Sequence, residues 1–309
     1  MYKFQPILKS TIWGGEKIVP YKHIASDQKQ VGESWELSGV KGNESVVAGG
    51  PEAGTTLPGL IARHGAALLG KANAARFGQE FPLLIKFIDA RQDLSIQVHP
   101  NDALAWERHK SKGKTEMWYV VDADKGARLR SGFAKQVTPA QYEASVEDNT
   151  ITDLLAEYEI HPGDLFFLPA GRVHSIGAGA FIAEIQQTSD ITYRIYDYGR
   201  LGADGKPRQL HIPQALDVTL REPPKAQDFH GHLAQCDYFT VDAVEGDFED
   251  VCDETSFTSL LVLEGKGTLT ETATGESLPI RKGQSLFLPA GTGAYTVTGT
   301  DLKCLRTRV

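Results

Sequence analysis

The stretch GDLFFLPAGRVHS, residues 163–175, decides the fold because its first nine residues recur later in the chain. Residues 283–291 read GQSLFLPAG, which lies 120 residues further on and is identical at six of nine positions. Upstream of the two copies, residues 119–129 (YVVDADKGARL) and 260–270 (LLVLEGKGTLT) are also alike. Because two parts of the pattern recur in the same order, we expect two related β-modules in tandem.

The two copies differ at the position three residues after their last glycine. The first copy has His174 there, and the second copy has Ala294. An imidazole is a common metal ligand, whereas a methyl group cannot bind a metal. This difference predicts one working site in the first module and a second module that serves as scaffold.

Most of the remaining chain has the pattern of short strands between turns rich in Gly, Pro, Asp and Asn. Helical patterns occupy three segments, residues 58–72, 101–110 and 138–160. Asn101 or Asp102 can cap the second segment, and Thr138 followed by Pro139 is typical of a helix start. We therefore expect a mainly β protein with a few short helices.

A second informative stretch is IDARQDLSIQVHPND, residues 88–102. Ile96 and Val98 alternate with Gln97 and His99, and side chains two residues apart on a strand point the same way. One face of this strand therefore presents an amide and an imidazole just before a Pro-Asn-Asp turn.

The composition is that of a soluble globular protein. The chain has 309 residues, 41% of them hydrophobic and 23% charged, with a net charge of -8. This charge argues against a general nucleic-acid or membrane surface. Cys236, Cys252 and Cys304 form no CxxC pair, which argues against a disulfide framework or a cysteine zinc site. With no signal peptide or long apolar run, we expect a cytoplasmic protein, and a monomer because nothing marks an interface.

The spacing of Gly163, Pro169, Gly171 and His174 resembles the second sequence motif of the cupin superfamily. Cupins are β-barrel proteins that commonly bind a metal inside the barrel. The resemblance has one departure here, because Ala178 stands where the motif usually has asparagine.

The first cupin motif is usually His-x-His followed closely by Glu, whereas this chain has Gln97-Val98-His99 with Glu116 seventeen residues later. Gln97, His99, Glu116 and His174 are therefore candidates for a four-ligand metal site. Zinc suits imidazole and carboxylate ligands, and the absence of thiolates favours an open catalytic site. Other histidines are more simply structural or solvated, with His161 expected in solvent: His23, His64, His109, His161, His211, His230 and His232.

Several longer segments resemble type I phosphomannose isomerase in its short bacterial form, over nearly the whole chain. They are STIWGG (10–15), GESWELS (32–38), PLLIKFIDARQDLSIQVHPND (82–102), GKTEMWYVV (113–121), LPAGRVHSIGAG (168–179) and EIQQTSDITYRIYDYGR (184–200). The resemblance implies a zinc-dependent, reversible conversion between mannose 6-phosphate and fructose 6-phosphate.

The same resemblance implies two tandem, jelly-roll-like cupin barrels. It implies one zinc ion per chain, in the first barrel, held by Gln97, His99, Glu116 and His174. We expect residues 1–225 to form an N-terminal catalytic domain with a helical insertion. Residues 226–309 are expected to form a C-terminal cupin domain without metal ligands.

An aldose–ketose isomerase must open the sugar ring and move a proton between C1 and C2 through an enediol. Arg194 matches the arginine treated as catalytic in the family, although pairing with Asp190 or Asp197 is an alternative explanation for it. Lys114 matches a family lysine near the substrate and shares a strand face with Glu116 if the strand has begun there. A surface lysine in the basic loop KSKGK is the alternative.

The remaining candidates are weaker. Asp190 is a candidate catalytic base or ring-opening group, and Glu184 shares that possibility or contacts the substrate. Both carboxylates could instead orient Arg194 or the metal ligands. Ser95, on the same strand face as Gln97, and Lys86 are further candidate substrate contacts.

Three other functions compete with this hypothesis. An iron-dependent cupin oxygenase usually has His-rich ligation, which Gln97 and the Arg194 motif count against. A non-catalytic sugar-binding cupin is a second alternative, although such a protein would be expected to have lost Arg194 or a ligand. The third is the same chemistry on another aldose, phosphorylated or not.

Overall fold

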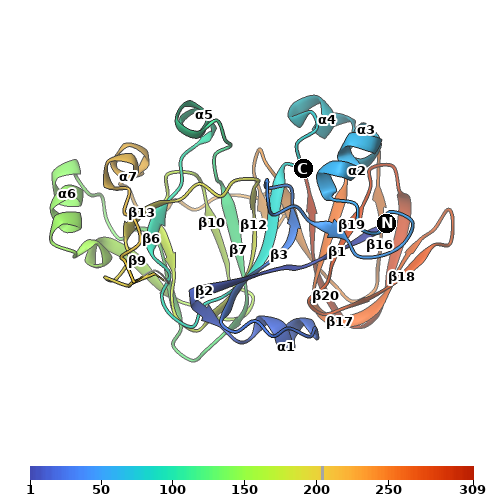
Figure 1. Ribbon diagram of the computed structural model, residues 1–309, viewed down its shortest axis with the longest axis horizontal. Helices are drawn as coiled ribbons and strands as arrows, with labels where there is room; N and C mark the ends of the chain where they lie inside the picture. The colour runs from blue at the N-terminus through green and yellow to red at the C-terminus, as the bar shows by residue number, and fades with distance from the viewer. Residues whose placement is uncertain (203–204) are drawn as a thin grey trace.

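The computed structural model describes residues 1–202 and 205–309, which form three stacked antiparallel sheets (Figure 1). The five-stranded sheet has the order β13 (Tyr193–Tyr196), β6 (Ile96–Val98), β11 (His174–Ile176), β8 (Arg128–Phe133) and β9 (Leu155–Glu159). The six-stranded sheet has the order β10 (Leu165–Leu168), β7 (Glu116–Ala123), β12 (Ala180–Gln187), β5 (Leu83–Asp89), β3 (Val31–Ser38) and β2 (Ile7–Gly15).

The nine-stranded sheet contains most of the C-terminal strands. Its main path is β14 (Ala234–Gln235), β15 (Thr240–Glu245), β20 (Gly293–Arg308), β17 (Thr258–Glu271), β19 (Ser285–Leu288), β1 (Tyr2–Gln5) and β4 (Val46–Val47). Off this path, β16 (Phe248–Cys252) pairs with β20, and β18 (Ser277–Arg281) pairs with β17. Strand β1 from the N-terminus therefore completes a sheet built mainly from the last part of the chain.

The six-stranded sheet lies in the middle of the stack. Successive side chains along its strands point into two different buried cores, one on each face. On β5, Ile85 and Phe87 belong to the core shared with the nine-stranded sheet, where Phe257 and Phe287 pack. Ile88, one residue later, belongs to the separate core that faces the five-stranded sheet. Side chains that alternate along a strand point to opposite faces, so both faces of this sheet are covered.

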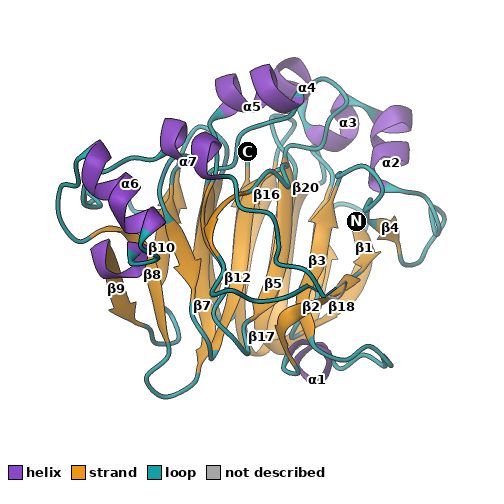
Figure 2. Ribbon diagram, turned by 60° about the vertical axis from the view of Figure 1, so that its left-hand side comes forward, coloured by secondary structure: helices purple, strands orange, loops and turns teal. Residues whose placement is uncertain are grey.

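The helices gather mostly at one end of the sheets, with α1 at the other end (Figure 2). They are α1 (Ile18–Lys22), α2 (Leu57–His64), α3 (Ala66–Leu69), α4 (Lys71–Phe77), α5 (Asp102–His109), α6 (Pro139–Glu147), the 3-10 helix η1 (Ile151–Leu154) and α7 (Ile212–Val218). In the described parts of the chain, no helix has both the length and the apolar character needed to cross a membrane.

The helix predictions are confirmed at their starts and partly wrong in their extents. Asn101 caps α5, and Thr138 caps α6 in a complete capping box. The expected helix over 58–72 is broken because Gly65 and Gly70 adopt φ values of 50° and 96°. The expected helix over 138–160 ends at Glu147, since residues 155–159 pair with β8 as strand β9. Pairing with a distant strand overrides the helical pattern there.

The sequence repeat corresponds to a structural repeat. Strand β10 pairs antiparallel with β7 in the first copy, and β19 pairs antiparallel with β17 in the second. The final glycines of the two copies, Gly171 and Gly291, have φ values of 87° and 77°. The mainly β, cupin-type fold with jelly-roll sheets is confirmed, although the facing sheets do not join into closed barrels. A domain boundary between residues 225 and 226 stays a prediction.

Candidate metal centre and active site

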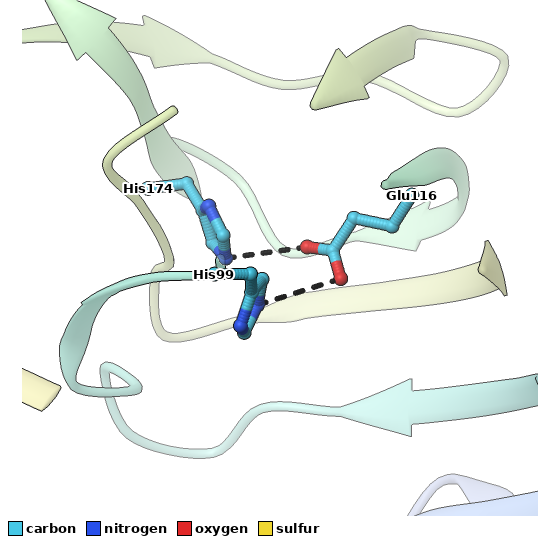
Figure 3. A group of neighbouring side chains, drawn as sticks. All are labelled: His99, Glu116 and His174. Atoms are coloured by element: carbon cyan, nitrogen blue, oxygen red, sulfur yellow. Dashed lines mark ion pairs between the residues drawn. The ribbon is translucent and has the colours of Figure 1, made fainter. Parts of the chain in front are cut away.

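The candidate site lies between the five-stranded and six-stranded sheets. His174 on β11 and Gln97 on β6 are opposite each other across the antiparallel pair, so both side chains point to the same face. His99 follows β6 directly, and Glu116 begins β7 in the facing sheet. The potential ligand atoms of His99, Glu116 and His174 lie within 4.8 Å of one another, and all three residues are buried (Figure 3).

The two imidazoles are held in the tautomer that a metal requires. The Nδ1 atom of His99 lies 2.8 Å from the carbonyl oxygen of Ile191, and Nδ1 of His174 lies 2.8 Å from that of Arg172. A carbonyl only accepts, so each Nδ1 carries the proton and each Nε2 presents a lone pair to the cluster. Burial and the Lys114 charge lower the pKa of His99 well below its usual value and that of His174 to about 3. Both rings are therefore neutral at pH 7.

Glu116 supplies the charge of the cluster. Its Oε1 lies 3.2 Å from Nε2 of His174, and its Oε2 lies 3.6 Å from Nε2 of His99. Burial raises the pKa of Glu116 to about 7, against the opposing effect of Lys114. The Lys114 ammonium lies 2.6 Å from Oε2, but neither carboxylate oxygen has a partner in hydrogen-bond geometry. A buried carboxylate whose Oε1 has no hydrogen-bond donor, beside two neutral imidazoles, fits a divalent cation.

Gln97 completes the candidate donor set. Its Nε2 lies 3.4 Å from Nε2 of His174, and its Oε1 accepts a hydrogen bond from Ser95 Oγ at 3.4 Å. A half-turn of the amide exchanges its oxygen and nitrogen, which places an oxygen donor toward the histidines. Two imidazole nitrogens, one carboxylate and one amide oxygen are a donor set suited to zinc.

The second copy of the repeat does not reproduce the donor set, because of the four equivalent positions only the counterpart of His99 carries a metal-binding side chain. Gly171 donates to the carbonyl of His99 at 2.8 Å, and Gly291 donates to that of Asp253 at 2.7 Å, which makes Asp253 the counterpart of His99. Strand pairing relates the other ligand positions of the first copy to positions of the second copy. Val251 is opposite Ala294 as Gln97 is opposite His174, and Thr258 is opposite Leu288 as Glu116 is opposite Leu168.

A network of buried charged side chains also lies on the six-stranded sheet. Lys86 and Glu184 are opposite each other on β5 and β12, and their charged groups lie 2.7 Å apart. Glu33 Oε2 lies 3.4 Å from the same ammonium, and Trp118 Nε1 donates to Glu184 Oε1 at 2.8 Å. Although burial opposes ionisation, Lys86 and then Lys114 lower the pKa of Glu184 to about 2. Glu184 is therefore an ionised carboxylate.

Arg194 lies on the same row as two candidate ligands. It is opposite Gln97, which is in turn opposite His174, so the three side chains emerge side by side from β13, β6 and β11. Its Nη1 donates to the carbonyl of Gln209 at 2.9 Å, whereas its buried Nε has no hydrogen-bond partner. Burial and the neighbouring Arg208 lower its pKa.

The alternative explanation for Arg194, an ion pair with Asp190 or Asp197, is not found among the described residues. Asp197 instead binds Arg200 at 2.6 Å and Arg208 at 2.6 and 2.7 Å. Arg194 thus keeps its positive charge available next to the cluster. Arg200 and Arg208 were not expected near the site, because only the folded loop brings them to Asp197.

The remaining predicted residues are placed differently. Ser95 is buried beside Gln97, whereas Asp190 is exposed and lines a cavity of about 550 Å³ with Lys112 and Trp106. Within the described parts of the chain, Asp190 forms no hydrogen bond or ion pair with the three-residue cluster, and its catalytic role stays a prediction. His161 is 70% exposed, as expected.

Two backbone contributors to the site were missed by sequence reasoning. The carbonyls of Ile191 and Arg172 orient the imidazoles, but a backbone carbonyl leaves no signal in the sequence. Glu33, which joins the Lys86 network, shares a face of β3 with Trp35.

Comparisons with known proteins show which family the chain belongs to. Residues 1–126 match the family described as phosphomannose isomerase type I, catalytic domain, and residues 230–309 match the mannose-6-phosphate isomerase cupin domain. Mannose-6-phosphate isomerase ManA of Bacillus subtilis (strain 168) is 35% identical over 310 residues, which cover 96% of this chain and 95% of that protein.

Solved structures give the same result. The crystal structure of mannose 6-phosphate isomerase from Bacillus subtilis has a TM-score of 0.89 at 30% identity and covers 100% of this chain and 99% of its own. A mannose 6-phosphate isomerase described as bound with zinc and yttrium shares the fold, with a TM-score of 0.77 at 19% identity over 99% and 98% of the chains. The chain therefore belongs to the type I mannose-6-phosphate isomerase family and is an isomerase that contains a cupin domain.

Proposed function

We propose that this isomerase is zinc-dependent and interconverts mannose 6-phosphate and fructose 6-phosphate through ring opening and an enediol. The observation that carries the proposal is that the ligand atoms of His99, Glu116 and His174 lie close together. The Nδ1 atoms of the two histidines donate hydrogen bonds to backbone carbonyls, so their Nε2 atoms are available to the metal. The zinc-bound member of the fold supports the choice of metal. One ion per chain is proposed, because Ala294 stands where the second copy would need a histidine.

When bound, zinc would supply a Lewis acid that holds sugar oxygens and stabilises developing negative charge. The protein itself would contribute fixed cations beside these oxygens. Lys114 Nζ lies 2.6 Å from Glu116 Oε2 and 3.1 Å from His99 Nε2, which places it at the edge of the cluster as a substrate-binding or proton-transferring group. Arg194 is proposed to stabilise the developing oxyanion, since its charge is permanent and it forms no ion pair among the described residues.

The charges around Arg194 support the proposed substrate class. Arg194, Arg200 and Arg208 carry three positive charges, whereas Asp197, which pairs with two of them, carries one negative charge. A phosphorylated sugar carries the complementary charge. Asp190 is proposed as the ring-opening or basic group. Ser95, Lys86 and Glu184 are proposed substrate contacts at the floor of the site.

The cellular setting is proposed from the sequence. The net charge of -8 suits a cytoplasmic enzyme with a small-molecule substrate and no nucleic-acid or membrane partner. A monomer is proposed as the working form, which size-exclusion chromatography with light scattering would check.

The decisive experiment is a coupled assay of metal-loaded protein on mannose 6-phosphate that follows fructose 6-phosphate formation. We expect fast turnover that a chelator abolishes and added zinc restores. Absence of turnover with zinc bound in stoichiometric amount would contradict the proposed substrate. A panel of other aldoses would then distinguish a different isomerase from a sugar-binding protein without activity.

A further inference from the structure

We infer that the C-terminal cupin domain acts on the active site through Tyr238, a positioning residue that fixes the backbone on both sides of Lys114. The inference rests on the proposed role of Lys114 in the reaction. Tyr238 lies in the turn between β14 and β15, within the residues that match the cupin domain family. Lys114 lies in the loop before β7. A series of hydrogen bonds connects Tyr238 to this loop.

The first link is a hydrogen bond between the two parts of the chain. The Tyr238 hydroxyl donates to Oδ2 of Asp102 at 2.8 Å. The second oxygen of the same carboxylate, Oδ1, accepts from the backbone N–H of Gly113 at 2.8 Å and from Nε2 of Gln187 at 2.9 Å. Tyr238 thus holds one carboxylate oxygen while the other oxygen holds the loop.

The second link extends from Asp102 to the residue after Lys114. Gln187, whose Nε2 is held by Asp102, accepts from the backbone N–H of Thr115 through Oε1 at 2.8 Å. The N–H of Lys114 donates to the carbonyl of Pro100 at 3.0 Å. Three successive backbone amides, at residues 113, 114 and 115, are therefore fixed, two of them by the Asp102–Gln187 unit.

The fixed backbone determines where the Lys114 ammonium lies. Its ammonium lies 2.6 Å from Glu116 Oε2 and 3.1 Å from His99 Nε2, so a small shift of its backbone changes its position against the reacting atoms. Misplacement of a catalytic group by about 1 Å can cost a hundredfold in rate.

The hydroxyl is needed because the carboxylate has room to turn. A cavity of about 270 Å³ is lined by Asp102, Gln187 and Tyr238 together with Arg76 and Lys112. Without the hydroxyl, Oδ2 can rotate toward the Arg76 or Lys112 cation that lines this cavity and release Gly113 or Gln187. The second domain, which lacks metal ligands, thereby acquires a role in catalysis.

The test compares Tyr238→Phe with a matched control, Tyr21→Phe. The Tyr21 hydroxyl also reaches the nine-stranded sheet, donating to the carbonyl of Leu263 at 2.7 Å, but α1 lies at the opposite end of the molecule from α5 (Figure 2). We expect Tyr238→Phe to lower kcat about tenfold with zinc content unchanged. Tyr21→Phe should lower only the melting temperature. Equal kcat values in both variants would overturn the inference.

A second comparison separates this inference from the proposed function. In a Lys114→Ala background, Tyr238→Phe should cause no further loss of kcat, because it acts through the lysine. If Lys114→Ala alone leaves turnover intact, the proposed role of Lys114 fails. If Lys114→Ala lowers kcat but Tyr238→Phe has no effect in the wild-type background, only the positioning role fails. Asp102→Asn, which keeps an oxygen acceptor for Gly113, should retain more activity than Asp102→Ala.

Discussion

His174 and Gln97 lie directly opposite each other on neighbouring antiparallel strands, although 77 residues separate them in the chain. This register places an imidazole and an amide on the same face, opposite Glu116 in the second sheet. The candidate site is therefore a product of strand pairing, and each of its members can be tested separately.

The metal ligands are tested by replacing one histidine. His174→Ala should lose both bound zinc and activity, because the two remaining strong donors cannot hold the ion tightly. Metal analysis of the purified protein and the coupled assay measure the two losses. His161→Ala, at a position that is 70% exposed, is the matched control and should keep both. A zinc-loaded, active His174→Ala protein would exclude this ligand set.

The second cupin copy provides the converse test. Ala294→His introduces the missing imidazole, but the neighbouring counterparts are Val251 and Thr258, which do not supply the amide and carboxylate of the first copy. We expect the zinc stoichiometry to remain at one per chain, measured by elemental analysis. A rise to two would show that a single histidine is sufficient in this fold.

Arg194 is tested for a role in the reaction that is independent of the metal. Arg194→Ala should keep zinc and the melting temperature but lower kcat by about 10² to 10³, as for loss of one preorganised group that stabilises an oxyanion. Arg128→Ala removes an arginine that is 56% exposed and should leave kcat unchanged. Near wild-type turnover in Arg194→Ala would refute the catalytic assignment.

The Lys86–Glu184 pair predicts a pH-dependent contribution to stability. The pKa of Glu184 is about 2 in the folded state, below its ordinary value of 4.5. Its ionised form therefore stabilises the fold above about pH 4.5, and this contribution is lost as the pH falls toward 2.

Glu184→Gln should accordingly lower the free energy of unfolding by about 3 kcal/mol at pH 7, since the buried Lys86 ammonium loses the carboxylate at 2.7 Å and keeps Glu33 at 3.4 Å. Urea unfolding at several pH values measures the difference, which should shrink below pH 4.5. Glu222→Gln, in an exposed pair with Lys225, should cost less than about 1 kcal/mol. A Glu184→Gln effect that is constant down to pH 3 would contradict the assignment.

The two copies of the repeat provide a matched pair of glycines, Gly171 and Gly291, for a test of stability. An added Cβ at Gly171 would lie 2.7 Å from the carbonyl oxygen of Val218, whereas at Gly291 the nearest atom is 3.8 Å away, on Glu254. Both positions have positive φ, so alanine costs about 1–2 kcal/mol at either one. Gly171→Ala should cost about 2 kcal/mol more because of the clash, measured by urea unfolding. Equal costs would show that the chain relaxes around Gly171.

The sequence by itself was sufficient for features that depend on neighbours in the chain. The repeated Gly-x5-Pro-x-Gly pattern identified the tandem cupin design, because the glycines take φ values that other residues avoid and recur at fixed spacing. Alternation along residues 96–99 placed Gln97 and His99 on one face, since strand periodicity is local. Asn101 and Thr138 indicated helix starts for the same reason.

Tertiary structure decided everything that depends on distant pairing. Residues 155–159 have a helical pattern but form a strand because β8 offers them an edge. The carbonyl of Ile191 fixes the tautomer of His99 across 92 residues, and Tyr238 reaches Asp102 across 136. Such contacts follow from the packing of whole sheets, which minimises exposed apolar surface over the entire chain, and no local period or spacing encodes them.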